Sequence, residues 1–91
     1  MSALAGQKVL VTGASRGIGL GVARAFVAAG ATVWALAEDE AVHDAARGIG
    51  ATGLRADVTD AGAVAAALAR TGALDVLVNN AGLERITPVD D

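Results

Sequence analysis

The sequence lacks several side chains on which enzymes and metal sites often depend. Its 91 residues include no cysteine and no tyrosine, and only one histidine. Without cysteine there are no disulfides, no thiolate metal ligands and no cysteine nucleophile. The acids between residues 38 and 44 have no second cluster of oxygen or imidazole ligands, so we expect no metal site. His43 lies in an alanine-rich predicted helix and is expected to be a surface residue.

The chain also lacks long apolar runs and any concentration of positive charge. No run reaches the roughly 18 apolar residues of a membrane-spanning helix, and residues 1–6 are too short for a signal peptide. The formal net charge is -3 and the Lys and Arg residues are scattered, unlike the basic patch of a nucleic-acid or membrane surface. We therefore expect a cytoplasmic protein that binds neither nucleic acid nor membrane.

Short apolar runs alternate with helical patterns along the chain. Apolar residues make up 54% of it but aromatics only 2%, so the core must consist mainly of Ala, Val, Leu and Ile. The predicted strands are residues 8–12, 31–37, 52–56 and 75–78. The predicted helices are residues 17–29, 38–47 and 61–70, and residues 83–91 are expected to form a loop.

This alternation predicts an α/β fold with a parallel sheet. Right-handed crossovers and the doubly wound pattern give four strands in the order 3-2-1-4 with three helices. Residues 1–91 would then form one incomplete Rossmann-like domain. Its ligand crevice would lie at the carboxyl ends of the first and fourth strands, where the strand order reverses.

A glycine-rich segment, Thr12-Gly13-Ala14-Ser15-Arg16-Gly17-Ile18-Gly19, follows the first predicted strand and opens the first helix. We call residues 12–19 the glycine turn. Such a turn leaves backbone N–H groups available and lets a pyrophosphate approach without meeting a Cβ, and the helix dipole favours the anion. Alternatively, glycines at this spacing merely permit the helix to pack tightly on the sheet. The strand before the turn and the helix after it favour phosphate binding.

Two further motifs follow later strands: Asp57-Val58 after the third, and Asn79-Asn80-Ala81-Gly82 after the fourth. Together with the spacing T-G-x-x-x-G-x-G, they resemble the short-chain dehydrogenase/reductase family over nearly the whole chain. The resemblance implies that the pyrophosphate and the adenosine ribose are lined by Gly13, Ser15, Arg16, Gly17, Ile18 and Gly19.

The same resemblance assigns the remaining predicted contacts of the dinucleotide. Asp57 would accept a hydrogen bond from the adenine amino group, with the backbone of Val58 beside the ring; alternatively Asp57 is a helix cap or a loop acid. Asn80, Ala81 and Gly82 would lie along the cofactor near its nicotinamide half. Asn79 is expected to serve structure, its amide bridging neighbouring strands.

The choice between NAD and NADP depends on the end of the second strand, where an acid binds the ribose hydroxyls of NAD. Ala37 stands where family members that prefer NAD usually carry Asp, and Glu38 follows it. Glu38 either contacts the ribose or is a solvent-exposed acid at a helix start. Arg16 instead resembles the basic residue of members that prefer NADP. We favour NAD.

The family's catalytic residues have no counterpart in this sequence. Hydride transfer to a carbonyl needs a proton donor, which the family supplies from a Tyr-x-x-x-Lys pair with a Ser and an Asn. The sequence has no tyrosine, and Lys8 is its only lysine. We therefore expect the cofactor-binding N-terminal part of an oxidoreductase, inactive on its own.

Two other functions remain open. The chain could be a non-catalytic module that binds a dinucleotide or an adenine nucleotide, or a half-Rossmann protein that self-assembles. In either case the fourth predicted strand would be an open apolar edge. Such an edge predicts self-association or pairing with a complementary C-terminal half.

Overall fold

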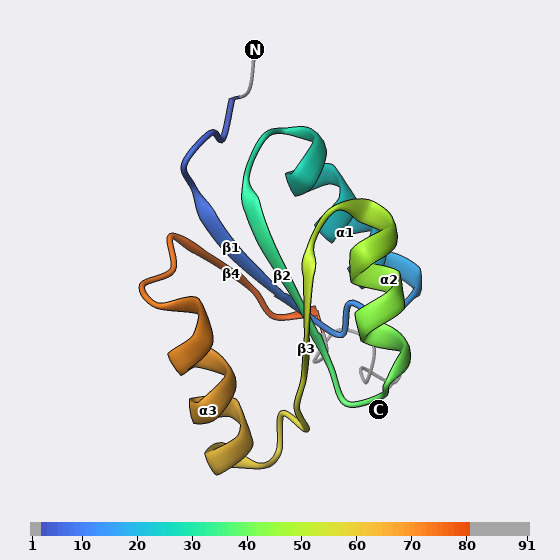
Figure 1. Ribbon diagram of the computed structural model, residues 1–91, viewed down its shortest axis with the longest axis vertical. Coiled ribbons are helices and arrows are strands. Elements are labelled where there is room, and N and C mark those ends of the chain that lie inside the picture. Colours follow the sequence, from blue (N-terminus) through green and yellow to red (C-terminus); the bar gives the residue numbers. More distant parts are fainter. Residues whose placement is uncertain (1–2, 81–91) are drawn as a thin grey trace, which may run out of the picture.

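The computed structural model describes residues 3–80, in which four strands alternate with three helices (Figure 1). The strands are β1 (Lys8–Thr12), β2 (Thr32–Ala37), β3 (Thr52–Arg55) and β4 (Val76–Val78). The helices are α1 (Gly17–Ala28), α2 (Ala41–Ile49) and α3 (Ala61–Thr71). This order confirms the predicted α/β alternation.

The four strands form one parallel sheet in the order β3-β2-β1-β4, as the sequence predicts. In the middle of the sheet Val11 lies opposite Ala35 of β2 and opposite Val78 of β4. The strand order reverses between β1 and β4, so the segments that follow these two strands emerge side by side. The glycine turn and Asn79 are therefore neighbours.

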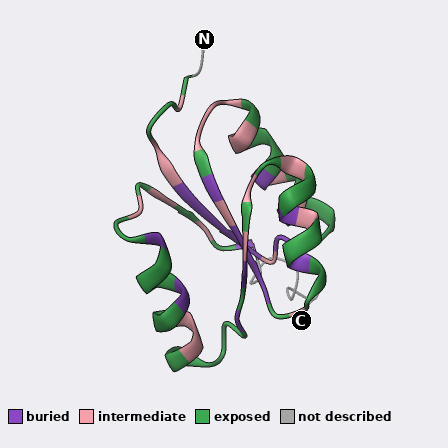
Figure 2. Cartoon of the chain, in the orientation of Figure 1, coloured by how far each residue is buried: buried purple, intermediate pink, exposed green. Residues whose placement is uncertain are grey.

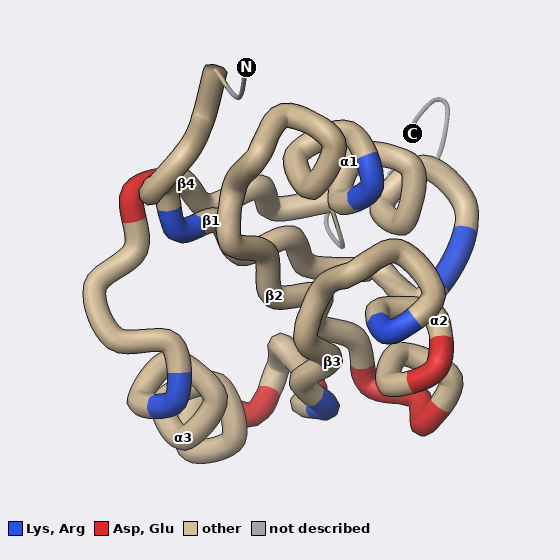
Figure 3. Tube along the Cα trace, turned by 45° about the horizontal axis from the view of Figure 1, so that its top comes forward, with Lys and Arg blue, Asp and Glu red and all other residues tan. Residues whose placement is uncertain are grey.

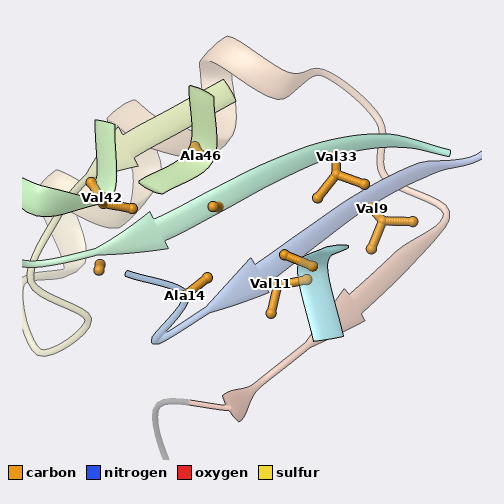
Figure 4. Packing of buried hydrophobic residues seen from close by; sticks show 9 residues of the cluster. Val9, Val11, Ala14, Val33, Val42 and Ala46 are labelled. Atoms are coloured by element: carbon orange, nitrogen blue, oxygen red, sulfur yellow. The ribbon is translucent and has the colours of Figure 1, made fainter. Parts of the chain in front are cut away.

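The two faces of the sheet carry separate hydrophobic clusters, because successive strand residues point to opposite faces. One face packs valines and alanines of β1 and β2 against α1 and α2 (Figure 4). On the other face the cluster consists of Leu10, Leu36, Leu54, Ala56 and Ala67. Figure 2 shows the buried segments concentrated in the central strands, whereas the outer faces of the helices are exposed.

Several element boundaries differ from those predicted. The acids at 38–40 precede α2 instead of forming its first turn, and the helix begins at Ala41. Acids just before a helix still lie at the positive end of its dipole. Gly50, with a φ of 85°, ends α2 in the left-handed conformation. Asp60 caps α3, as expected, by accepting a hydrogen bond of 3.1 Å from the amide of Ala63.

The β4 edge of the sheet has no further strand within residues 3–80. Leu77 of β4 is 61% exposed, although its neighbour in register on β1, Leu10, is only 2% exposed. At the β4 edge an exposed apolar side chain thus stands beside a buried one of the neighbouring strand.

No helix within residues 3–80 is both long and apolar enough to cross a membrane. The Lys and Arg residues are spread over several elements and do not gather on one face (Figure 3).

Candidate functional site

The glycine turn joins the carboxyl end of β1 to the start of α1. Gly13 and Gly17 have φ values of 63° and 61°, a region that side chains with a Cβ rarely adopt. Arg16 occupies the N-cap of α1 in an extended conformation, and no side chain caps the helix. The first amides of a helix lack intrahelical acceptors, so this uncapped N-terminus can receive an anion.

Two glycines of the turn serve different purposes. A Cβ on Gly17 would meet no atom within 4 Å, so the space beside it is open. A Cβ on Gly19 would collide with the carbonyl oxygen of Gly13 and lie 2.6 Å from Asn80 Nδ2. Close packing against Gly13 and Asn80 therefore requires glycine at position 19. At position 17 glycine is favoured by the positive φ, and the space beside it is open. The tight-packing interpretation therefore applies to Gly19, whereas phosphate binding beside Gly17 stays a prediction.

Asn79 and Asn80 hold the end of β4 against the glycine turn. Asn80 is buried, and its Nδ2 donates a hydrogen bond of 3.3 Å to the carbonyl oxygen of Gly13. Asn79 Oδ1 accepts a hydrogen bond of 3.2 Å from the hydroxyl of Thr12 on β1, which confirms the predicted bridge between strands. Ala81 and Gly82, predicted along the cofactor, lie outside the described residues.

Ser15 connects the glycine turn to the segment after β2. Its hydroxyl donates a hydrogen bond of 3.0 Å to Asp39 Oδ2. Asp39 Oδ1 is buried and has no hydrogen-bond partner within residues 3–80. In the sequence, Asp39 is one of several acids at a predicted helix start and was not singled out as a site residue. The only signal was its position two residues after the end of a strand. Its hydrogen-bond partner, Ser15, lies 24 residues earlier, so the sequence does not reveal the contact.

The outer surface of the turn is formed by exposed side chains. Ile18 is 72% exposed, and Arg16 beside it is exposed as well. The side chain of Arg16 makes no hydrogen bond or ion pair with other described residues. An apolar and a cationic side chain are thus both available to a ligand at this turn.

An open hollow of about 340 Å³ lies at the carboxyl ends of β2 and β3. It is lined by Glu38, Arg55, Ala56 and Asp57, and we call it the β2–β3 hollow. The structure therefore brings together Glu38 and Asp57, which are predicted to contact the ribose and the adenine. Val58, 39% exposed, follows directly.

Arg55 also lines the hollow, although no pattern in the sequence predicts it there. Its Nε donates a hydrogen bond of 2.9 Å to the carbonyl oxygen of Glu38, and its Nη1 lies 3.5 Å from Glu40 Oε1. These contacts fix the guanidinium beside the β2–β3 hollow. Arg55 belongs to no motif of the sequence. Its contact with the Glu38 carbonyl becomes apparent only once β3 is paired with β2.

Asp57 also has a local structural role. Its Oδ1 accepts hydrogen bonds from the amide and the hydroxyl of Thr59, at 2.9 and 2.7 Å. Asp57 therefore does stabilise its own loop, as the alternative interpretation predicted. The same residue still lines the wall of the β2–β3 hollow. The predicted contact of Asp57 with adenine stays a prediction.

The arrangement suits an adenosine diphosphate group. An uncapped helix N-terminus lies at one end, an open hollow lies at the other, and the Ser15–Asp39 hydrogen bond connects them. Asp39 Oδ1 is a buried acceptor without a donor, and a bound polar group could supply one. Within residues 3–80 no three His, Cys, Asp or Glu side chains are grouped to hold a metal ion.

Comparison with known proteins gives consistent matches. The short chain dehydrogenase family model matches residues 7–91. Oxidoreductase UcpA from Salmonella typhimurium is 42% identical over 94% of this chain and 36% of UcpA. Gluconate 5-dehydrogenase from Gluconobacter oxydans is 43% identical over 97% of this chain and 38% of that protein.

Solved structures of short-chain oxidoreductases share the fold of this chain. A metagenomic short-chain oxidoreductase in complex with NADP has a TM-score of 0.79 and 39% identity, covering 96% of this chain and 47% of that one. The 3-ketoacyl-(acyl-carrier-protein) reductase from Brucella melitensis, complexed with NADH, has a TM-score of 0.71 and 34% identity. That match covers 82% of this chain and 34% of the reductase.

The chain thus spans little more than a third of the length of UcpA and of gluconate 5-dehydrogenase, and the match lies in their N-terminal part. Within that part, the family match extends over almost all 91 residues and includes the glycine turn and both later motifs. The sheet order is the one predicted from the α/β alternation and the right-handed crossovers. The chain belongs to the short-chain dehydrogenase family.

Proposed function

We propose that these 91 residues bind a nicotinamide adenine dinucleotide, with NAD preferred over NADP. The observation that carries the proposal is the Ser15–Asp39 hydrogen bond, which joins the glycine turn to the segment after β2, where Glu38 lines the β2–β3 hollow. Relatives with solved structures in complex with NADP and with NADH support a dinucleotide of this class.

The pyrophosphate would lie at the start of α1. There the amides of the first turn and the helix dipole favour negative charge, and Gly17 leaves open space for the approach. Arg16 and Ile18 would cover the ligand from the solvent side.

The adenosine would lie in the β2–β3 hollow. Asp57 on its wall would accept a hydrogen bond from an adenine amino group, and Val58 would border the ring. The acids Glu38, Asp39 and Glu40 follow β2, so this end of the site carries more carboxylates than guanidiniums. Carboxylates accept hydrogen bonds from ribose hydroxyls and repel a phosphate.

A bound nicotinamide would accept or supply a hydride, and a reaction at a carbonyl also requires a proton donor. These residues contain no tyrosine, and Lys8 begins β1 at the end opposite the glycine turn. Its ammonium lies 5.5 Å from the ring centroid of Trp34. We therefore assign cofactor binding to these residues, and expect hydride transfer between the nicotinamide and an alcohol or carbonyl substrate to need residues outside them.

We further propose that the β4 edge mediates association, either with a second copy or with a complementary C-terminal half of the same fold. The exposed Leu77 and the absence of a further strand within residues 3–80 support this. Unpaired strand edges readily accept another strand.

Calorimetric titration of the full chain with NAD, NADP and ADP tests the proposed binding. Gly17→Val should weaken binding of all three by more than about tenfold, because a branched side chain would fill the approach of the pyrophosphate. Gly6→Val is the matched control: Gly6 also has a positive φ, 84°, and a Cβ there would meet nothing within 4 Å, but it precedes β1. Equal nucleotide affinities in Gly17→Val and the parent would show that the glycine turn is not the site.

A further inference from the structure

Another hollow, of about 260 Å³, lies between the edge strand β3 and helix α3, on the face of the sheet that α1 and α2 do not cover (Figure 1). We call it the α3 hollow. It shares Arg55 with the β2–β3 hollow, but none of its other lining residues belongs to the proposed dinucleotide site. The residues that line it are Leu54, Arg55, Ala63, Ala66, Ala67 and Arg70.

The α3 hollow is open because α3 presents alanines to β3. Ala63, Ala66 and Ala67 recur at the spacing of one helix face, and each side chain ends at its Cβ. Within α3 only Ala67 and Thr71 are buried. On the strand side the hollow is lined by Leu54, which is 1% exposed. Small side chains opposite a buried leucine leave an apolar space that neither element fills.

The charge at the α3 hollow is positive. Of its two arginines, Arg55 is already engaged by the Glu38 carbonyl and by Glu40. Arg70 is exposed, and its guanidinium makes no hydrogen bond or ion pair with another residue of the described range 3–80. No carboxylate from residues 3–80 lines this hollow, whereas Glu38 and Asp57 line the β2–β3 hollow. A cation without a partner therefore borders an apolar space.

Arg70 lies one helical turn beyond Ala66 and Ala67, and side chains of a helix lean toward its N-terminus. The guanidinium can therefore reach back over the hollow. It can bind a carboxylate through two parallel hydrogen bonds, while the alanines and Leu54 favour an apolar chain. With about 260 Å³, the hollow is smaller than the roughly 300–1,000 Å³ of pockets for drug-sized ligands, so its ligand must be small.

We propose that the α3 hollow binds a small monocarboxylic acid, with its short aliphatic chain against Leu54 and the alanines and its carboxylate on Arg70. This site needs neither the glycine turn nor a bound dinucleotide. A cation in the last turn of α3 also interacts favourably with the helix dipole. That structural role alone would change stability and would not produce a carboxylate site.

An NMR titration of the full chain with sodium hexanoate, at constant pH and ionic strength and without nucleotide, tests the proposal. We expect saturable shifts of backbone amides around Leu54 of β3 and around Ala66 of α3, with a dissociation constant on the order of 1–10 mM. Hexan-1-ol has the same chain without the charge and should bind about fivefold more weakly. The positions of the shifted amides distinguish this hollow from the glycine turn, where an anion could also bind.

Three variants complete the test, each checked for folding by circular dichroism. Arg70→Gln should raise the dissociation constant of hexanoate about fivefold, because it removes the charge and keeps most of the stem. Ala66→Leu should also weaken binding, because the larger side chain occupies the hollow. Arg24→Gln is the matched control, since Arg24 is an exposed arginine on α1, and should leave the affinity unchanged.

Hexanol that binds as tightly as hexanoate, or a folded Arg70→Gln with the parent affinity, would overturn the role of Arg70 and with it the proposal. Shifts confined to the glycine turn, or no saturable shift far above the expected dissociation constant, would overturn the site itself. If Arg70→Gln does not fold, the comparison of hexanoate with hexanol and the Ala66→Leu variant still decide. None of these outcomes bears on dinucleotide binding, because no nucleotide is present.

Discussion

The side-chain amide nitrogen of Asn80, Nδ2, lies 2.6 Å from the position that a β-carbon on Gly19 would occupy. The two residues are far apart in the sequence, one in the first turn of α1 and one just after β4. Asn80 fills this space and donates a hydrogen bond to Gly13, so the end of β4, the glycine turn and α1 form one packed unit. The shape of the candidate pyrophosphate site thus depends on a residue at the other end of the described chain.

Gly19→Ala should lower the free energy of unfolding by at least about 2 kcal/mol, because the added methyl would overlap the backbone carbonyl of Gly13. Urea denaturation followed by circular dichroism measures the change. Gly21→Ala in the same helix is the control: a Cβ there meets nothing within 4 Å, and alanine favours helix, so stability should be unchanged or higher. Equal losses in both variants would contradict the packing argument.

Asn80→Ala should cost about 1–3 kcal/mol of stability, because it leaves the Gly13 carbonyl without this donor in a part-buried site. It should also weaken ADP binding, since the carbonyl belongs to the glycine turn. Parallel denaturation and calorimetric titration separate the two effects. A variant with parent-like stability and parent-like ADP affinity would show that the contact has no such role.

Asp60→Ala should destabilise the chain by about 1 kcal/mol, because Asp60 accepts from the Ala63 amide at the start of α3. Asp60→Asn should retain most of that stability, since asparagine caps helices about as well. Thermal unfolding of both variants provides the comparison. Indistinguishable melting temperatures for Asp60→Ala and the parent would exclude a stabilising cap.

Leu77→Lys should reduce self-association at the β4 edge and raise the dissociation constant of any oligomer by more than about tenfold, because charged side chains on an edge strand oppose further pairing. Size-exclusion chromatography with light scattering over a range of concentrations measures it. Leu68→Lys on α3 is the control, since Leu68 is 37% exposed but belongs to a helix and offers no strand edge. A parent that stays monomeric at every concentration would refute the prediction.

The strands and helices could be predicted because each is encoded locally. The run at 8–12 is apolar enough to be buried on both faces, and the glycines at 30 and 50 end helices. The errors were at boundaries, as with the acids at 38–40, because a helix start depends on where the chain leaves the sheet. The strand order was predictable from the right-handed crossovers of a doubly wound sheet, and the family from three motifs that follow three of the strands.

The element order, the sheet topology and the family all follow from the amino-acid sequence alone, because short-range patterns and fixed crossover handedness leave few alternatives. Which side chains of those motifs meet depends instead on the folded chain. Ser15 and Asp39 are 24 residues apart, and Asn80 lies 67 residues from its acceptor Gly13. Such contacts are set by how the ends of neighbouring strands pack, and no local pattern records that. The glycine turn was thus recognisable in the sequence as a candidate phosphate site, but the acid beside it became visible only in the fold.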